Sequence, residues 1–183
     1  MRGLQSLLSL KIVSMLLPLA LILGACHSKR SVTRPATSTN RYERVTDDWA
    51  TLNITLHSDD NQKLYREIKG WLGVPYRYGG NTKSGVDCSG FVLQVYKTVY
   101  NKRVERNSAK IFEKNCRLID VDELREGDLL FYCTGKKTKG ITHVGIYLRD
   151  NKFAHASSKG VKISDITEDY FIDHFYAAGR VVK

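Results

Sequence analysis

The sequence predicts an α+β domain in which helices come first and antiparallel strands follow. The chain has 183 residues, which is about one domain's worth of sequence. Apolar residues make up 42% of the chain and charged residues 26%, a balance that permits a packed core and excludes wholesale disorder. Apolar residues at helical spacing precede runs typical of strands, and this order is that of α+β domains.

Residues 1–25 are typical of a targeting segment and not of a folded domain. Basic residues precede an apolar stretch from Ile12 to Leu23, which is too short to cross a bilayer as a helix. The stretch ends at Cys26 in the sequence LGAC and resembles a bacterial lipoprotein signal, which implies that Cys26 is lipidated. An ordinary signal peptide with a coincidental cysteine is the alternative.

We expect residues 26–60 to form a lipidated N-terminus and a flexible tether, and residues 61–183 to form the domain. The tether is rich in Ser, Thr, Asn and charge, although apolar residues between 49 and 56 could form a short ordered patch. The anchor would hold the protein in the cell envelope, on the outer membrane facing the periplasm if the source has two membranes. There the net charge of +10 does not imply nucleic acid, and we expect a monomer that binds none.

Three helices are predicted in the first half of the domain. Apolar spacing over residues 64–72 predicts the first helix, with Asp59 or Asp60 as its cap. The second helix begins at Asp87, and a weaker pattern predicts a third over Ser108–Lys114.

Strands follow, marked by β-branched and aromatic runs between turn signals. We expect them at Asp128–Cys133, Ile141–Leu148, Lys152–Ala156, Gly160–Ser164 and Phe175–Val182. The short connection at residues 149–151 predicts a hairpin between the second and third of these strands.

Cys88 is the strongest candidate for a nucleophile. Asp87 can cap the second helix, which puts Cys88 in the first turn, where unpaired backbone N–H groups and the helix dipole stabilise a thiolate. A lone cysteine is more often a small buried apolar residue, so its position alone does not decide its role.

A nucleophilic thiol needs a base, and His143 and His155 fall in the two strands of the predicted hairpin. If the loop has three residues, with Asn151 in the left-handed conformation, Gly145 faces His155 and His143 lies diagonally beside it on the same face. His143 could then take the proton of Cys88 while His155 orients the His143 ring. A two-residue loop would put the two histidines on opposite faces.

Several blocks of sequence occur in a specific order. They are VPYRYGG at 74–80, GVDCSGFV at 85–92, LREGDLLFY at 124–132, HVGIY at 143–147 and FAHAS at 153–157. Together they resemble the NlpC/p60 family of cell-wall cysteine peptidases, and the resemblance covers about residues 61–182. It implies a papain-like α+β domain in which the nucleophile helix packs on an antiparallel sheet. Some relatives carry an SH3-like domain, but we expect none here because the predicted tether at residues 26–60 leaves no room for one.

The resemblance also implies roles for single residues. The implied catalytic set is Cys88 as nucleophile, His143 as base, His155 as its orienting partner and Tyr76 as a donor to the oxyanion. Tyr76 could instead only pack the glycine-rich loop. Asp87 and Ser89 flank the nucleophile and are candidates for substrate contacts, although both could serve only as helix caps.

These roles predict a cysteine endopeptidase that hydrolyses amide bonds in peptidoglycan stem peptides or cross-links through a thioester. The sequence does not say which bond is cut. We expect no cofactor and no metal, because the chain has no CxxC or HExxH motif. A non-catalytic wall-binding lipoprotein and an amidase or acyltransferase on the same fold are the alternatives. The spacing of Cys116 and Cys133 permits a disulfide without establishing one.

Overall fold

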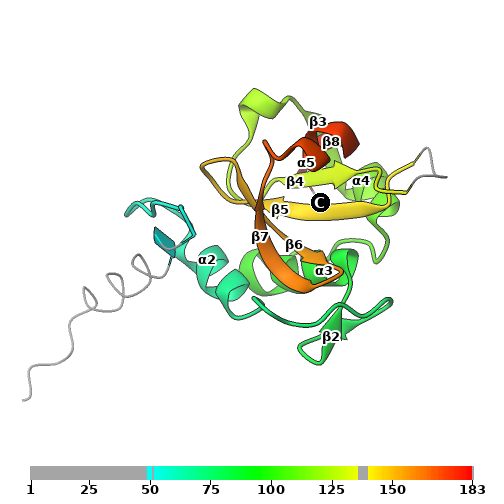
Figure 1. The fold of residues 1–183 in the computed structure, drawn as a ribbon, viewed down its shortest axis with the longest axis horizontal. Coiled ribbons are helices and arrows are strands. Elements are labelled where there is room, and N and C mark those ends of the chain that lie inside the picture. The colour runs from blue at the N-terminus through cyan, green and yellow to red at the C-terminus, as the bar shows by residue number, and fades with distance from the viewer. Residues whose placement is uncertain (1–48, 51, 136–139, 183) are drawn as a thin grey trace, which may run out of the picture. The chain divides into compact units, whose positions relative to one another are not determined.

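The main sheet of the protein has six antiparallel strands in the order β3-β8-β4-β5-β6-β7 (Figure 1). The computed structural model describes residues 49–50, 52–135 and 140–182. The sheet strands are β3 (Cys116–Ile119), β4 (Leu129–Tyr132), β5 (His143–Tyr147), β6 (Lys152–Ser157), β7 (Gly160–Asp165) and β8 (Phe175–Val181). The α-helices are α2 (Gln62–Lys69), α3 (Cys88–Tyr100), α4 (Ser108–Asn115) and α5 (Asp169–His174). The predicted α+β class is confirmed.

All the predicted helices and strands form, with bounds that differ by a few residues at most. The structure adds elements that the sequence patterns did not predict. These are β3, α5, a small hairpin of β1 (Asn81–Thr82) and β2 (Gly85–Val86), and a 3-10 turn, η1 (Val121–Glu123).

Helix α2 is capped by Asn61, whose side-chain oxygen accepts a hydrogen bond from the Leu64 N–H at 3.1 Å. The predicted cap at Asp59 or Asp60 is therefore wrong. Asp60 instead forms an ion pair with Arg149, in the loop between β5 and β6. That ion pair fastens the start of α2 to the hairpin that carries the two histidines.

Helix α3 begins as predicted, with Asp87 as its cap and Cys88 as its first residue. The Asp87 side chain accepts a hydrogen bond from the Gly90 N–H at 2.7 Å. A side-chain carbon at Gly90 would lie 2.3 Å from the carbonyl oxygen of Gly80, so the helix and the preceding loop meet backbone to backbone. The helix ends at Asn101, which adopts the left-handed conformation with φ of 52°.

The sheet is covered on both faces, and β4 shows how the two apolar clusters divide. Leu129 and Phe131 join the cluster formed with the larger helices, whereas Leu130 and Tyr132 join a second cluster with Phe171 of α5. Alternate residues of a strand point to opposite faces, so these clusters lie on opposite sides of the sheet. Double coverage explains why all four residues of β4 are buried.

The folded part begins earlier than the predicted boundary between tether and domain. Trp49, Ile54 and Leu56 are buried in the main core, and the Trp49 ring packs edge-on against Tyr65 with 5.1 Å between ring centroids. This contact joins a stretch without a local period to α2, so the period of the sequence could not indicate it.

The predicted signal segment and Cys26 lie outside the described residues. The lipid anchor therefore stays a prediction. Across residues 49–50, 52–135 and 140–182, none of the helices combines the length and the apolar character that spanning a membrane requires.

Candidate active site

Cys88 lies at the start of α3 and is 9% exposed. Burial raises the pKa of its thiol, and the nearby N–H groups of Val144 and Ser89, which lower this pKa, do not offset the effect of burial. The sequence predicted a thiolate stabilised by the helix N-terminus. In the structure desolvation outweighs that stabilisation, and the sulfur rests as a neutral thiol.

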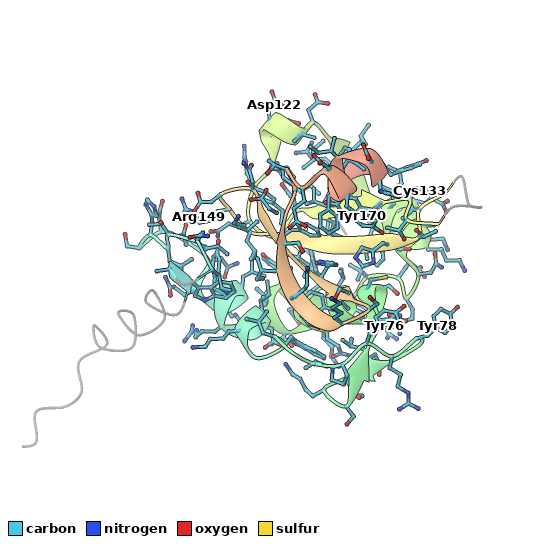
Figure 2. The ribbon with its side chains drawn as sticks, in the orientation of Figure 1. Tyr76, Tyr78, Asp122, Cys133, Arg149 and Tyr170 are labelled. Carbon is cyan, nitrogen blue, oxygen red and sulfur yellow. The ribbon has the colours of Figure 1, made fainter. Side chains whose placement is uncertain are left out.

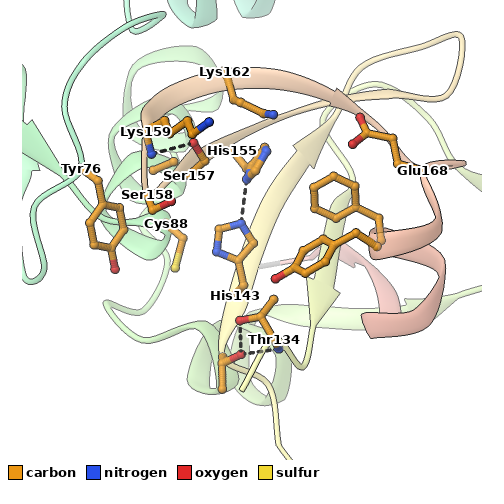
Figure 3. A pocket seen from close by; sticks show the side chains of 14 residues that line it. Tyr76, Cys88, Thr134, His143, His155, Ser157, Ser158, Lys159, Lys162 and Glu168 are labelled. Atoms are coloured by element: carbon orange, nitrogen blue, oxygen red, sulfur yellow. Dashed lines mark hydrogen bonds between the residues drawn. The ribbon is translucent and has the colours of Figure 1, made fainter. Parts of the chain in front are cut away.

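The histidine hairpin has the predicted loop and register, with Asp150 and Asn151 both in the left-handed conformation. As a result His143 of β5 and His155 of β6 lie on the same face of the sheet. His143 Nε2 and His155 Nδ1 are 2.9 Å apart, within hydrogen-bond distance. Figure 3 shows the His143 ring between Cys88 and His155.

Both imidazoles are neutral at pH 7. Burial lowers the pKa of His143 to about 4. Burial also lowers the pKa of His155 to about 3, and the nearby His143 and Lys162 lower it further. A neutral imidazole can accept a proton, so His143 rests in the form that a general base requires.

The plane of the His155 ring is fixed by aromatic neighbours. Phe153 stacks on it with 4.8 Å between centroids, and Phe171 meets it edge-on at 5.4 Å. A side-chain carbon at Gly145 would lie 2.6 Å from the Phe153 ring. Gly145 therefore makes room for the Phe153 ring that stacks on His155.

Cys88, His143 and His155 line a pocket of about 780 Å³. Such a volume suits a short peptide. Other residues around it include Tyr76, Ser157, Lys159, Lys162 and Glu168 (Figure 3). The pocket thus combines the sulfur and the imidazoles with ammonium and carboxylate groups that can meet a charged substrate.

Tyr76 lies on the segment before β1 and forms a parallel bridge with Val86, two residues before Cys88. Its side chain is 40% exposed and lines the pocket. Partial burial and the neighbouring Cys88 and Asp87 raise the pKa of the hydroxyl, which keeps it protonated and able to donate. Tyr78, on the same turn, is 90% exposed (Figure 2).

Asp87 and Ser89 both contact Arg106, a residue that no sequence pattern marked. Arg106 Nη1 lies 2.6 Å from Asp87 Oδ1 and 2.7 Å from Ser89 Oγ, and Nη2 lies 2.9 Å from Asp87 Oδ2. The Gly79 N–H also donates to Asp87 Oδ2 at 2.8 Å. These contacts outweigh burial and lower the pKa of Asp87. They favour the structural interpretation of both residues, and a substrate contact remains only a prediction.

Ser164 of β7 is the second residue that the patterns did not reveal. Its Oγ lies 3.1 Å from His155 Nε2, so the histidine pair continues into a hydroxyl group. Cys116 and Cys133, both in the described part of the chain, are not bonded to each other. Over that same part, no cluster of three His, Cys, Asp or Glu side chains is arranged to hold a metal ion.

A thiol at a helix N-terminus beside an imidazole, with a third group holding that imidazole, is the arrangement of papain-like cysteine hydrolases. The NlpC/P60 family matches residues 73–180, which is more than half of the chain. The chain therefore belongs to the NlpC/P60 family.

Two relatives come from Escherichia coli K12. The protein named "Probable endopeptidase NlpC" is 42% identical over 119 residues, which cover 64% of this chain and 76% of the relative. The protein named "Murein DD-endopeptidase MepS/Murein LD-carboxypeptidase" is 35% identical over 132 residues, covering 72% and 68%. A crystal structure of a lipoprotein-like NLP/P60 protein from Staphylococcus aureus superposes with a TM-score of 0.62 at 29% identity. That match covers 70% of this chain and 43% of the other.

Proposed function

We propose that this chain is a cysteine endopeptidase that hydrolyses amide bonds in peptidoglycan stem peptides or their cross-links. The alignment of Cys88, His143 and His155 along one pocket carries the proposal. The name of the relative that is a murein DD-endopeptidase and LD-carboxypeptidase supports the substrate class. Membership of the NlpC/P60 family supports the reaction type.

The first step forms the carbon–sulfur bond. His143 Nε2 is engaged by His155, which leaves Nδ1 to accept the thiol proton. As that proton leaves, the Cys88 sulfur attacks the amide carbon, and the carbonyl electron pair moves onto oxygen. Because thiol and imidazole both rest uncharged, a proton has to pass from the sulfur to His143 before or during the attack.

The oxyanion formed in this step needs donors. The Cys88 N–H lies in the first turn of α3, where no helical carbonyl is available to it, and the Tyr76 hydroxyl lines the same pocket. One well-placed donor of this kind contributes about 3 kcal/mol in the transition state. Tyr76 and the Cys88 backbone are therefore the oxyanion donors in this mechanism.

The second half of the reaction releases the amine and then the carboxylic acid. Protonated His143 gives its proton to the amide nitrogen, the carbon–nitrogen bond breaks, and the amine leaves a thioester on Cys88. His143 then takes a proton from water as the oxygen adds to the thioester carbon. The sulfur leaves, regains the proton from His143, and the second product is a carboxylic acid.

Digestion of purified muropeptides, with mass spectrometry of the products, tests this function. We expect cleavage of a cross-linked or uncross-linked stem peptide with the gain of one water per bond, and no cleavage by Cys88→Ala. Binding of intact muropeptides without cleavage would instead identify a non-catalytic wall-binding protein. Transfer of the acyl group to an added amine in preference to water would identify an acyltransferase.

We also propose that Cys26 carries lipid and holds the protein in the cell envelope, on the outer membrane facing the periplasm if the source has two membranes. The lipoprotein-like signal before Cys26 supports this proposal. Cys26→Ser should move the protein from the membrane pellet to the soluble fraction. A variant that stays in the pellet after a salt wash would contradict lipidation as the anchor.

A further inference from the structure

Ser164 extends the histidine pair by one more hydrogen bond. It lies on β7 opposite Phe153 and diagonal to His155, and it is 4% exposed. Its Oγ is 3.1 Å from His155 Nε2, while His155 Nδ1 is 2.9 Å from His143 Nε2. Ser164, His155 and His143, from three neighbouring strands, are therefore joined in one line by two hydrogen bonds. Figure 3 shows the two histidines of this line, with the His143 ring next to Cys88.

The number of N–H and O–H protons in this line allows only two arrangements of donors and acceptors. Each imidazole is neutral and carries one N–H, and the bond between the two rings needs one proton. In the first arrangement His143 donates from Nε2 to His155, and His155 donates from Nε2 to the Ser164 hydroxyl. In the second, Ser164 donates to His155 Nε2, and His155 donates from Nδ1 to His143.

Only the first arrangement can support proton transfer from Cys88. There His143 Nδ1 is unprotonated and can accept the thiol proton. In the second arrangement His143 carries its proton on Nδ1, so the nitrogen needed by Cys88 is a donor. The direction of the hydrogen bond at Ser164, the far end of the line, is therefore linked to whether His143 can act as a base.

We propose that Ser164 is a positioning residue that accepts a hydrogen bond from His155 and so holds His143 in the base-competent tautomer. This inference rests on the proposed function of the Cys88 site. Phe153 and Phe171 fix the plane of the His155 ring but offer no hydrogen-bonding group. The nearby Lys162 ammonium, whose charge lowers the pKa of His155, can only donate and is no acceptor for an N–H on Nε2. The choice of tautomer is left to the hydroxyl.

Removal of the Ser164 hydroxyl should reverse the donor–acceptor direction of the hydrogen bond between His155 and His143. With alanine at position 164, an N–H on His155 Nε2 would be buried without an acceptor, and a buried N–H without a partner is costly. His155 avoids this by carrying its proton on Nδ1 and donating it to His143 Nε2. His143 then holds its proton on Nδ1 and loses its ability to accept one from Cys88.

Nitrogen-15 NMR of the two imidazoles tests this directly, because ring nitrogen shifts distinguish the tautomers without substrate or turnover. In the full-length protein in detergent we expect both histidines to carry the proton on Nε2. In Ser164→Ala we expect both protons on Nδ1. Ser164→Thr, which keeps a hydroxyl, should restore the wild-type tautomers, and Thr167→Ala, which removes an exposed hydroxyl further along the chain, should not change them.

Kinetics supply the second measurement. Ser164→Ala should lower kcat roughly tenfold or more with little change in KM, since the base is lost and substrate contacts are not. Ser164→Thr should recover most of that loss. A proton on Nδ1 of the wild-type histidines, or unchanged tautomers in Ser164→Ala, would overturn the proposal. If Ser164→Ala does not fold, Ser164→Cys takes its place, because its weakly accepting thiol should give a mixture of tautomers. The tautomer result stands even if the protein cleaves no muropeptide, so the two proposals fail separately.

Discussion

Burial holds the Cys88 thiol and the His143 imidazole in their uncharged forms at neutral pH. The pKa of the thiol lies above its ordinary value, and that of His143 falls to about 4. In the proposed mechanism the reaction therefore starts from a neutral pair, and the charges on sulfur and imidazole have to form during the reaction. The donors around the oxyanion matter more in such a site, because they meet charge that forms in the transition state.

The pH dependence of kcat/KM should reflect the uncharged resting forms of Cys88 and His143. His143 must be unprotonated to act as a base, and it is unprotonated above its pKa of about 4. The acid limb of kcat/KM should therefore lie well below the 6.5 of an ordinary histidine, with activity retained at pH 5. Rates of muropeptide cleavage between pH 4 and 9 check this, with circular dichroism at each pH to confirm folding. An acid limb near pH 6.5 would contradict the neutral pair.

The His143 ring depends on His155 for its orientation. His155→Ala should lower kcat strongly with little change in KM, whereas His155→Asn should keep partial activity because an amide oxygen can accept the same hydrogen bond. Steady-state kinetics on one purified muropeptide separate kcat from KM. An effect of His155→Ala on KM alone would show that the residue binds substrate and does not orient the base.

At this scale, local sequence predicted only some of the contacts that the structure shows. Cys88 follows its own helix cap, and the register of one short hairpin brings His143 and His155 together, so local reasoning could place all three. Arg106 meets Asp87 across 19 positions of chain, and Ser164 meets His155 from another strand. No period or motif links such pairs, and only the packed fold reveals them.

At the scale of elements, the junction of α3 with the glycine-rich loop positions the nucleophile. Arg106 joins the Asp87 cap to the Gly80 carbonyl, which its Nη2 contacts at 2.8 Å. Gly90 allows the helix to touch the loop at the same point. A change here should move the start of α3 and, with it, the sulfur of Cys88.

Arg106→Gln should therefore lower the free energy of unfolding by about 2 kcal/mol, because the buried Asp87 carboxylate loses its charged partner. Urea unfolding at pH 7 measures this change. Arg103→Gln, an exposed neighbour on the same segment, is the matched control and should have little effect. Equal stability of the two variants would show that the ion pair contributes nothing to the junction.

Clear local patterns predicted α2, α3 and five strands of the main sheet, and a weaker pattern predicted α4. The remaining elements have no such pattern. Strand β3 is half exposed, with Leu118 66% exposed, so it lacks an alternating apolar face. Helix α5 has only six residues, too few for a period to show. Both form because they pair with or cover strands that are distant in the chain, β8 for β3 and β4 for α5.

At the scale of the whole molecule, the stretch from residue 49 to residue 56 joins the predicted tether to the core. Trp49 is 1% exposed and packs on Tyr65 of α2. The chain that leads toward Cys26 is thus fastened to the same helix layer that supports α3. Along the chain, the proposed lipid anchor at Cys26 is connected to the active site through this packed stretch.

Trp49→Ala should lower the free energy of unfolding by about 3 kcal/mol, because it leaves a cavity in the main core. Chemical denaturation followed by circular dichroism measures the change. Thr55→Ala, an exposed change in the same stretch, should be nearly neutral. If the two variants were equally stable, residues 49–56 would belong to the tether after all.

In the proposed function the Cys88 thiol and the His143 imidazole together cleave peptide bonds of peptidoglycan. The most direct measurement compares muropeptide cleavage by the wild type, Cys88→Ala and His143→Ala, with circular dichroism and thermal unfolding showing that each variant is folded. We expect folded variants whose cleavage rates fall roughly a thousandfold or more, since one lacks the nucleophile and the other its base. Cleavage near the wild-type rate by either folded variant would contradict the proposed function.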